Sequence, residues 1–117
     1  MNNNFGLWRW LFQRITAIIL VVLLAVHLIT LHFSHQAFTF KTVVARIQSS
    51  SGWLIFYTLF LIVALSHGIN GFYQVVEDYK PSAGFKKFLI LISWVGGIIL
   101  FIWGLRVLMS WWKFNPL

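Results

Sequence analysis

The residues best suited to chemistry lie in one stretch of otherwise apolar sequence, residues 65–81. His67 stands inside the apolar run, and the only two acidic residues of the chain, Glu77 and Asp78, come near its end. At about 100° per residue a helix here places its polar groups on one narrow face: His67, Asn70, Gly71, Gln74 and Asp78. Polar groups within a membrane span cost free energy unless they are satisfied, so this face indicates a functional site.

His67 has the chemistry of an axial ligand for a b-type haem. A neutral imidazole can bind the iron through one ring nitrogen while an acceptor holds the other, and Gly71 leaves room for a flat macrocycle or for a packed helix. A histidine hydrogen-bonded between helices is the alternative. His27 lies toward the opposite membrane face, roughly 10 Å away in depth, so one haem would not bridge the two histidines. His27 is therefore structural or serves a second haem.

Asp78 and Tyr79 follow where the apolar run leaves the membrane. A phenol can donate a hydrogen bond to a carbonyl, and a nearby carboxylate can orient it or relay protons, which are the requirements of quinone reduction. The alternative is an interfacial tyrosine beside an aspartate that pairs with Lys80. Arg14, one turn into the first apolar segment, can extend to phosphate headgroups or pair with a haem propionate.

Composition indicates the kind of scaffold that must position these residues. The chain has 117 residues, of which 60% are hydrophobic and 9% charged, as in membrane proteins. It contains no cysteine, which excludes disulfides, thiolate metal sites, cysteine-ligated iron–sulfur clusters and covalently attached c-type haem. The net charge of +7 comes from single basic residues at the ends of apolar runs, a pattern that argues against nucleic-acid binding.

Hydropathy predicts an all-α integral membrane protein, a single domain over residues 1–117 with spans at about 10–31, 52–76 and 85–108. Residues 38–47 are expected to form a short interfacial helix. Ser93, Gly97 and Gly104 share one face of the third span, which allows a neighbouring helix to approach closely. Three spans put the N-terminus and the second connection on one side, and the greater number of lysines and arginines there predicts that this side is cytoplasmic.

Two parts of the sequence resemble a known family. The pattern His67, Gly71 and Glu77-Asp78-Tyr79 is similar to the second transmembrane helix of the small, D-type cytochrome b anchor subunit of succinate dehydrogenase. The QRITA run at residues 13–17 resembles the entry into that family's first helix. The resemblance implies a subunit of succinate:quinone oxidoreductase (respiratory complex II) that is not catalytic alone. It implies His67 as axial ligand of haem b, Arg14 at a haem propionate, and Tyr79 with Asp78 at the quinone.

The same resemblance implies the surroundings of the chain. A second, C-type anchor subunit would complete the haem-binding bundle and supply the other axial ligand. An iron–sulfur subunit and a flavoprotein subunit would deliver electrons to ubiquinone or menaquinone, at the bacterial inner (cytoplasmic) membrane. Three alternatives remain: the anchor of a quinol:fumarate reductase, a small proton-coupled transporter or pore subunit, and an assembly subunit whose His67 binds nothing. A transporter would be expected to place an acidic residue deep in a span, whereas both acids here lie at the membrane edge.

Overall fold

The computed structural model describes residues 4–35 and 37–114 and is all-helical over them. Four helices follow in order: α1 (Asn4–Phe33), α2 (Phe40–Ser49), α3 (Ser51–Tyr79) and α4 (Ala83–Trp112). Three of them, α1, α3 and α4, are long and apolar enough to cross a membrane, which confirms the predicted all-α fold with three spans. Residues 1–3, 36 and 115–117 of the expected 1–117 domain lie outside the described residues.

The long helices extend beyond the apolar runs at both ends. α1 begins at Asn4, ahead of the span predicted from about residue 10, and α4 continues to Trp112, past the predicted end at about residue 108. α3 begins after Ser50, whose side chain accepts a hydrogen bond from the Gly52 backbone N–H, and ends where Lys80 adopts a left-handed conformation at φ 48°. A helix satisfies its own backbone hydrogen bonds and can therefore continue past the hydrocarbon into the headgroup layer, so hydropathy alone underestimates its length.

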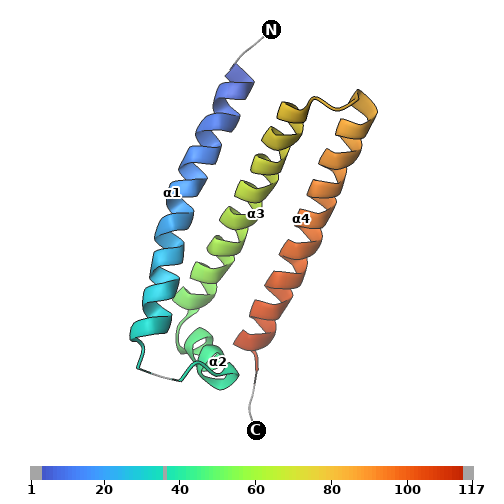
Figure 1. The fold of residues 1–117 in the computed structure, drawn as a ribbon. Helices are drawn as coiled ribbons and strands as arrows, with labels where there is room; N and C mark the ends of the chain where they lie inside the picture. The colour runs from blue at the N-terminus through green and yellow to red at the C-terminus, as the bar shows by residue number, and fades with distance from the viewer. Residues whose placement is uncertain (1–3, 36, 115–117) are drawn as a thin grey trace.

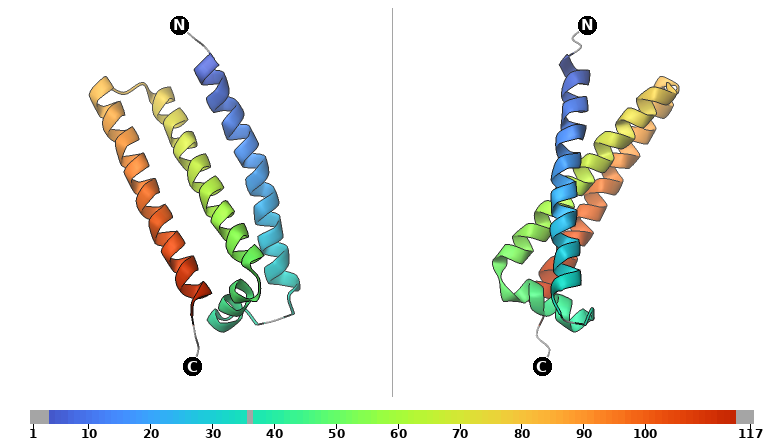
Figure 2. Two further views of the ribbon diagram at one scale, coloured as in Figure 1. Left: turned by 180° about the vertical axis from the view of Figure 1, so that it is seen from behind. Right: turned by 60° about the vertical axis from the view of Figure 1, so that its left-hand side comes forward.

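The three long helices lie in a row with α3 in the middle (Figure 1). Helix α3 packs against both α1 and α4, while among the described residues no Cα atom of α1 comes within 8 Å of a Cα atom of α4. Figure 2 shows that α3 and α4 run nearly alongside each other and that α1 crosses them at an angle. The start of α1 and the α3–α4 connection lie at one end of the molecule, and α2 lies at the other, as three spans require.

Small residues bring α3 and α4 together, as the sequence predicted. A Cβ atom at Gly97 would lie 2.5 Å from Cδ1 of Ile69, and one at Gly104 would lie 2.8 Å from Cδ2 of Leu61. The side chains of Ile69 and Leu61 on α3 therefore occupy the space that the missing Cβ atoms of Gly97 and Gly104 leave. Close backbone approach of this kind stabilises helix pairs in lipid, where the hydrophobic effect contributes little.

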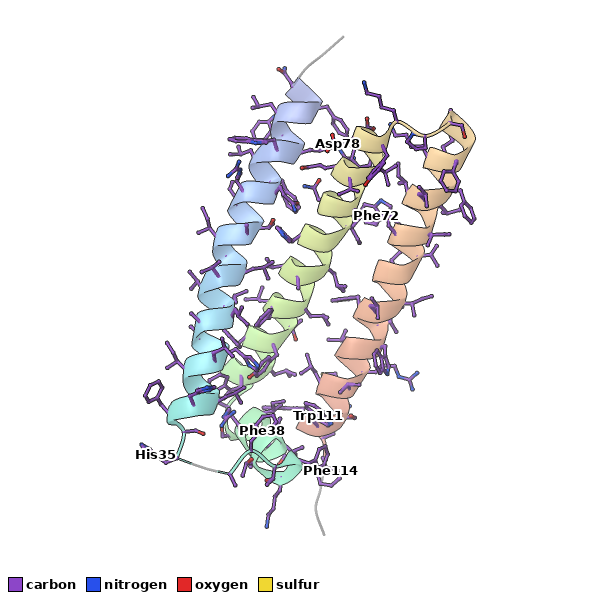
Figure 3. All side chains as sticks on the ribbon, viewed as in Figure 1. His35, Phe38, Phe72, Asp78, Trp111 and Phe114 are labelled. Atoms are coloured by element: carbon purple, nitrogen blue, oxygen red, sulfur yellow. The ribbon has the colours of Figure 1, made fainter. Side chains whose placement is uncertain are left out.

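Helix α2 closes the end opposite the N-terminus. It starts at Phe40 rather than at the predicted residue 38 because Thr39 and Thr42 form a reciprocal capping box ahead of it. Its inner side buries Val44 and Ile47, and Gln48 Nε2 donates a hydrogen bond of 3.0 Å to the Trp111 carbonyl of α4. Figure 3 shows Phe38, Trp111 and Phe114 together at this end.

Candidate functional site

The predicted polar face of α3 exists, and α1 of the same chain satisfies much of it. Asn70 is buried, and its Nδ2 donates hydrogen bonds to the Arg9 carbonyl at 3.0 Å and to Gln13 Oε1 at 2.8 Å. Gln74 Nε2 donates to the same Arg9 carbonyl at 3.1 Å. The Asn70 and Gln74 side chains are thus held by α1.

His67 lies between α3 and α1 with both ring nitrogens near polar groups. Its Nδ1 is 2.9 Å from Oγ1 of Thr16, and its Nε2 is 3.4 Å from Nε2 of Gln13. Thr16 is 5% exposed, which makes it one of the few buried polar residues of the described chain. The structure therefore places His67 in an interhelical hydrogen-bonded position.

Gly71 provides the space in which the Gln13 side chain packs. A Cβ atom at residue 71 would lie 2.8 Å from Gln13 Nε2. Of the two uses that the sequence suggested for this glycine, room for a macrocycle or for a packed helix, the structure shows the second. The Gln13 amide fits against the bare α3 backbone and so reaches both Asn70 and His67.

Arg9 is a site residue that sequence reasoning missed, because it was read only as a charge flanking the membrane. Its guanidinium lies 3.5 Å from the centroid of the Tyr73 ring, and one of its nitrogens donates to Asn70 Oδ1 at 3.4 Å. An arginine over a tyrosine face is stabilised by the ring quadrupole. The spacing of Arg9, Gln13 and Thr16, four and then three residues apart, was the available signal, since it puts three polar side chains on one face of α1.

Asp78 lines a cleft of about 420 Å³ between the ends of α1 and α3. Arg9 and Tyr73 line the same cleft, and they also line a second cleft of about 390 Å³ that continues along α3 and α4 with largely apolar walls. Figure 3 shows Asp78 at this end of α3, close to the start of α1. Tyr79 is 82% exposed at the last position of α3 and does not line either cleft. The structure thus brings Asp78, but not Tyr79, beside Arg9.

Arg14 lies apart from His67. Its side chain is exposed, and its guanidinium is 5.1 Å from the centroid of the Trp10 ring on the same helix. Thr16 and Gln13, rather than Arg14, face α3 at this level. The Arg14 side chain therefore points away from α3, toward the outside of the helix row.

His27 forms a separate cluster nearer the other end of the molecule. Its Nδ1 is 2.9 Å from the Tyr57 hydroxyl, and its ring lies edge-on to the rings of Tyr57 and Phe60. Tyr57 precedes His67 on α3 by about three turns, or roughly 15 Å. Two histidines at these levels cannot bind opposite faces of one iron, and the contacts of His27 are those of a structural residue.

Comparison with known proteins gives a consistent result. The family described as succinate dehydrogenase/fumarate reductase transmembrane subunit matches residues 1–105, which include α1, α2, α3 and most of α4. A succinate dehydrogenase hydrophobic membrane anchor subunit of Thermoplasma acidophilum is 31% identical over 94 residues, covering 79% of this chain and 76% of that protein. This three-span helical chain therefore belongs to the family of succinate dehydrogenase/fumarate reductase transmembrane subunits.

Proposed function

We propose that this chain is the D-type membrane anchor of a succinate:quinone oxidoreductase. In this role it shares haem b with a second, C-type anchor subunit and helps to form the site at which quinone is reduced. The observation that carries the proposal is the polar face of α3, which runs from His67 inside the span to Asp78 at the membrane edge in a chain of this family. Ionisable and polar side chains inside a membrane span cost free energy, so a face of them supports a functional site.

The residues around His67 fit one axial ligand of a haem. The side chain is an imidazole inside an apolar span, with a hydroxyl 2.9 Å from Nδ1 and a flexible amide, rather than backbone, near Nε2. His67 would hold the iron through Nε2, and the Gln13 side chain would have to turn its amide aside to free that nitrogen. When bound, the haem would supply a one-electron carrier within the membrane.

The remaining contacts of the haem involve groups at the surface of this chain and beyond it. Arg14 is exposed on α1 close in sequence to Gln13 and Thr16, which makes it our candidate for a propionate partner. The second axial ligand would come from the C-type subunit, because His27 is placed about three turns away and is bonded to Tyr57.

The quinone site in this proposal lies at the Asp78 end of α3. Tyr79, exposed there, would donate a hydrogen bond from its phenol to a quinone carbonyl. Asp78, in the cleft with Arg9, would orient the headgroup and relay protons from the membrane surface. Two electrons delivered by the iron–sulfur subunit and two protons taken up at this edge would convert quinone to quinol.

The same end of the molecule would face the soluble subunits. Five basic residues belong to this end: Arg9 and Arg14 in the first half of α1, and Lys80, Lys86 and Lys87 at the α3–α4 connection and the start of α4. By the positive-inside rule this end, including the N-terminus, is cytoplasmic, and the iron–sulfur and flavoprotein subunits would bind there. We place the complex in the bacterial inner membrane.

The test is the reduced-minus-oxidised visible spectrum of the membrane complex purified through this chain, for wild type, His67→Ala and His27→Ala. We expect a b-type α band in wild type and in His27→Ala, and its loss or shift in His67→Ala. In the same preparations Tyr79→Phe should lower succinate-dependent quinone reduction while the haem band is kept. A wild-type complex without a haem band, or a band unchanged in His67→Ala, would refute the ligand assignment.

A further inference from the structure

We infer that Thr16 is a positioning residue that fixes the tautomer of His67, with the ring proton on Nδ1 and the lone pair on Nε2. The structure shows a chain of hydrogen bonds between α1 and α3 that begins and ends at backbone carbonyls of α1. A carbonyl oxygen can only accept a hydrogen bond. The carbonyl at each end therefore determines which group is the donor in every bond along the chain. The consequence for iron binding rests on the proposed role of His67, whereas the tautomer itself does not.

The first end is the carbonyl of Phe12. The Thr16 hydroxyl lies 2.8 Å from it, the usual bond of a helical threonine to the residue four positions earlier. The carbonyls of Phe12 at 2.8 Å and Gln13 at 3.2 Å are both within reach of its single hydrogen, and when the hydroxyl donates to either of them Oγ1 accepts from the imidazole nitrogen 2.9 Å away. The proton of His67 must then be on Nδ1.

The second end is the carbonyl of Arg9, and it leads to the same result. Asn70 Nδ2 donates to this carbonyl at 3.0 Å, which orients the Asn70 amide, and its other hydrogen goes to Gln13 Oε1 at 2.8 Å. Gln13 must therefore turn its NH₂ group toward His67, where it lies 3.4 Å from Nε2. A donor in that place favours an unprotonated Nε2, so the second end agrees with the first through a contact that is longer, and therefore weaker, than the 2.9 Å bond to Thr16.

This tautomer is the one that an iron ligand through Nε2 needs. Histidines that bind metals commonly donate the other ring N–H to an oxygen, which orients the ring and makes it more basic. Thr16 is 5% exposed, so water cannot easily take the place of its hydroxyl. Without iron, the Gln13 amide faces the lone pair of Nε2. If iron replaced Gln13 at Nε2, the hydrogen bond from Nδ1 to Thr16 would still hold the ring in its orientation.

The first test measures the tautomer without any haem. The full chain, with ¹⁵N-labelled histidine and reconstituted in lipid nanodiscs, is compared as wild type, Thr16→Ser and Thr16→Val, and His67→Ala identifies the His67 signals. We expect an Nδ1-protonated ring in wild type and in Thr16→Ser, and a mixture of tautomers in Thr16→Val. An Nε2-protonated ring in wild type, or an unchanged ring in Thr16→Val, would overturn the inference.

The second test measures the consequence in the holocomplex. We expect Thr16→Val to weaken haem retention by about 10- to 100-fold and to shift the haem midpoint potential, with Thr16→Ser restoring both toward wild type. A Thr16→Val complex with wild-type haem retention and potential would overturn the positioning role. A wild-type complex without haem would instead refute the proposed function of His67, and the tautomer measured in nanodiscs would still decide the inference about Thr16.

Discussion

Gln13 and Gly71 fit together across the α1–α3 interface, with the amide nitrogen of Gln13 only 2.8 Å from the place where a Cβ of residue 71 would stand. This contact is what lets a single α1 side chain reach both Asn70 and His67. Any side chain at position 71 must push the Gln13 amide away from its partners.

We therefore expect Gly71→Ala to destabilise the subunit relative to Gly68→Ala, by about 0.5–1.5 kcal/mol for each hydrogen bond lost, because the added methyl group displaces the Gln13 amide from Asn70 and His67. Gly68→Ala is the matched control, since no atom lies within 4 Å of a Cβ at that position of the same helix. Thermal unfolding of the purified complex, followed by circular dichroism, measures both. Equal melting temperatures for the two variants would contradict the packing described for Gln13.

The α3–α4 interface makes a second pair of positions testable. Gly97→Ala places a Cβ 2.5 Å from Cδ1 of Ile69, and we expect a loss of about 1–3 kcal/mol. Ile69→Val removes that Cδ1 atom and leaves the nearest Cγ1 at 3.3 Å, so the double variant should recover part of the loss. Gly96→Ala should not destabilise the protein, because nothing lies within 4 Å of the added Cβ and alanine has the higher helix propensity. The same unfolding assay applies, and an additive double variant would argue against the contact.

A variant of the His27 cluster can distinguish a structural role of His27 from binding of a second haem. Tyr57→Phe removes the hydroxyl 2.9 Å from His27 Nδ1 and should cost about 0.5–1.5 kcal/mol of stability, the net value of one hydrogen bond. The haem-to-protein ratio should stay at its wild-type value, because this cluster lies about three turns from His67. Pyridine haemochrome titration measures that ratio. A fall in haem content without a fall in stability would indicate that His27 serves a haem of its own.

Asp78 is expected to support quinone reduction without holding haem. We predict that Asp78→Asn lowers succinate-dependent quinone reduction by about 100-fold, the lower range for a positioned acid or base, and keeps the b-type spectrum. Glu77→Gln is the control: it removes the negative charge of the neighbouring carboxylate that pairs with Lys86 and should leave the rate near wild type. The readout is reduction of a soluble quinone analogue, and equal losses in the two variants would point to a general effect of charge at this end.

Much of the fold could be predicted from the sequence because lipid restricts the possibilities. Uninterrupted apolar runs indicated three spans, and the spacing from His67 to Asp78 indicated one polar face on α3. Helix ends were less accurate, because residues such as Asn4 and Trp112 extend a helix without adding hydrophobicity. The interfacial helix was displaced by two residues because the capping box of Thr39 was overlooked.

The partners of the polar face could not be predicted from periodicity. Arg9 and Gln13 stand about sixty residues before Asn70 in the sequence, and only the packing of α1 on α3 brings them together. The sequence also does not distinguish an arginine that flanks the membrane from one that packs between helices, because Arg9 would precede the apolar run in either case. Haem binding by His67, the propionate contact of Arg14 and quinone binding by Tyr79 with Asp78 stay predictions, because each depends on a molecule beyond this chain.

The row of helices has a thermodynamic consequence. Since α3 alone touches both α1 and α4 among the described residues, the two outer helices dock on it independently. In a double-mutant cycle between Thr16 on one side and Gly97 on the other, the coupling free energy should stay within about 0.5 kcal/mol of zero. Loss of either outer helix from α3 should therefore leave most contacts of the other in place, apart from those that meet at Tyr73, whose ring is approached by Arg9 of α1 and by Lys86 of α4.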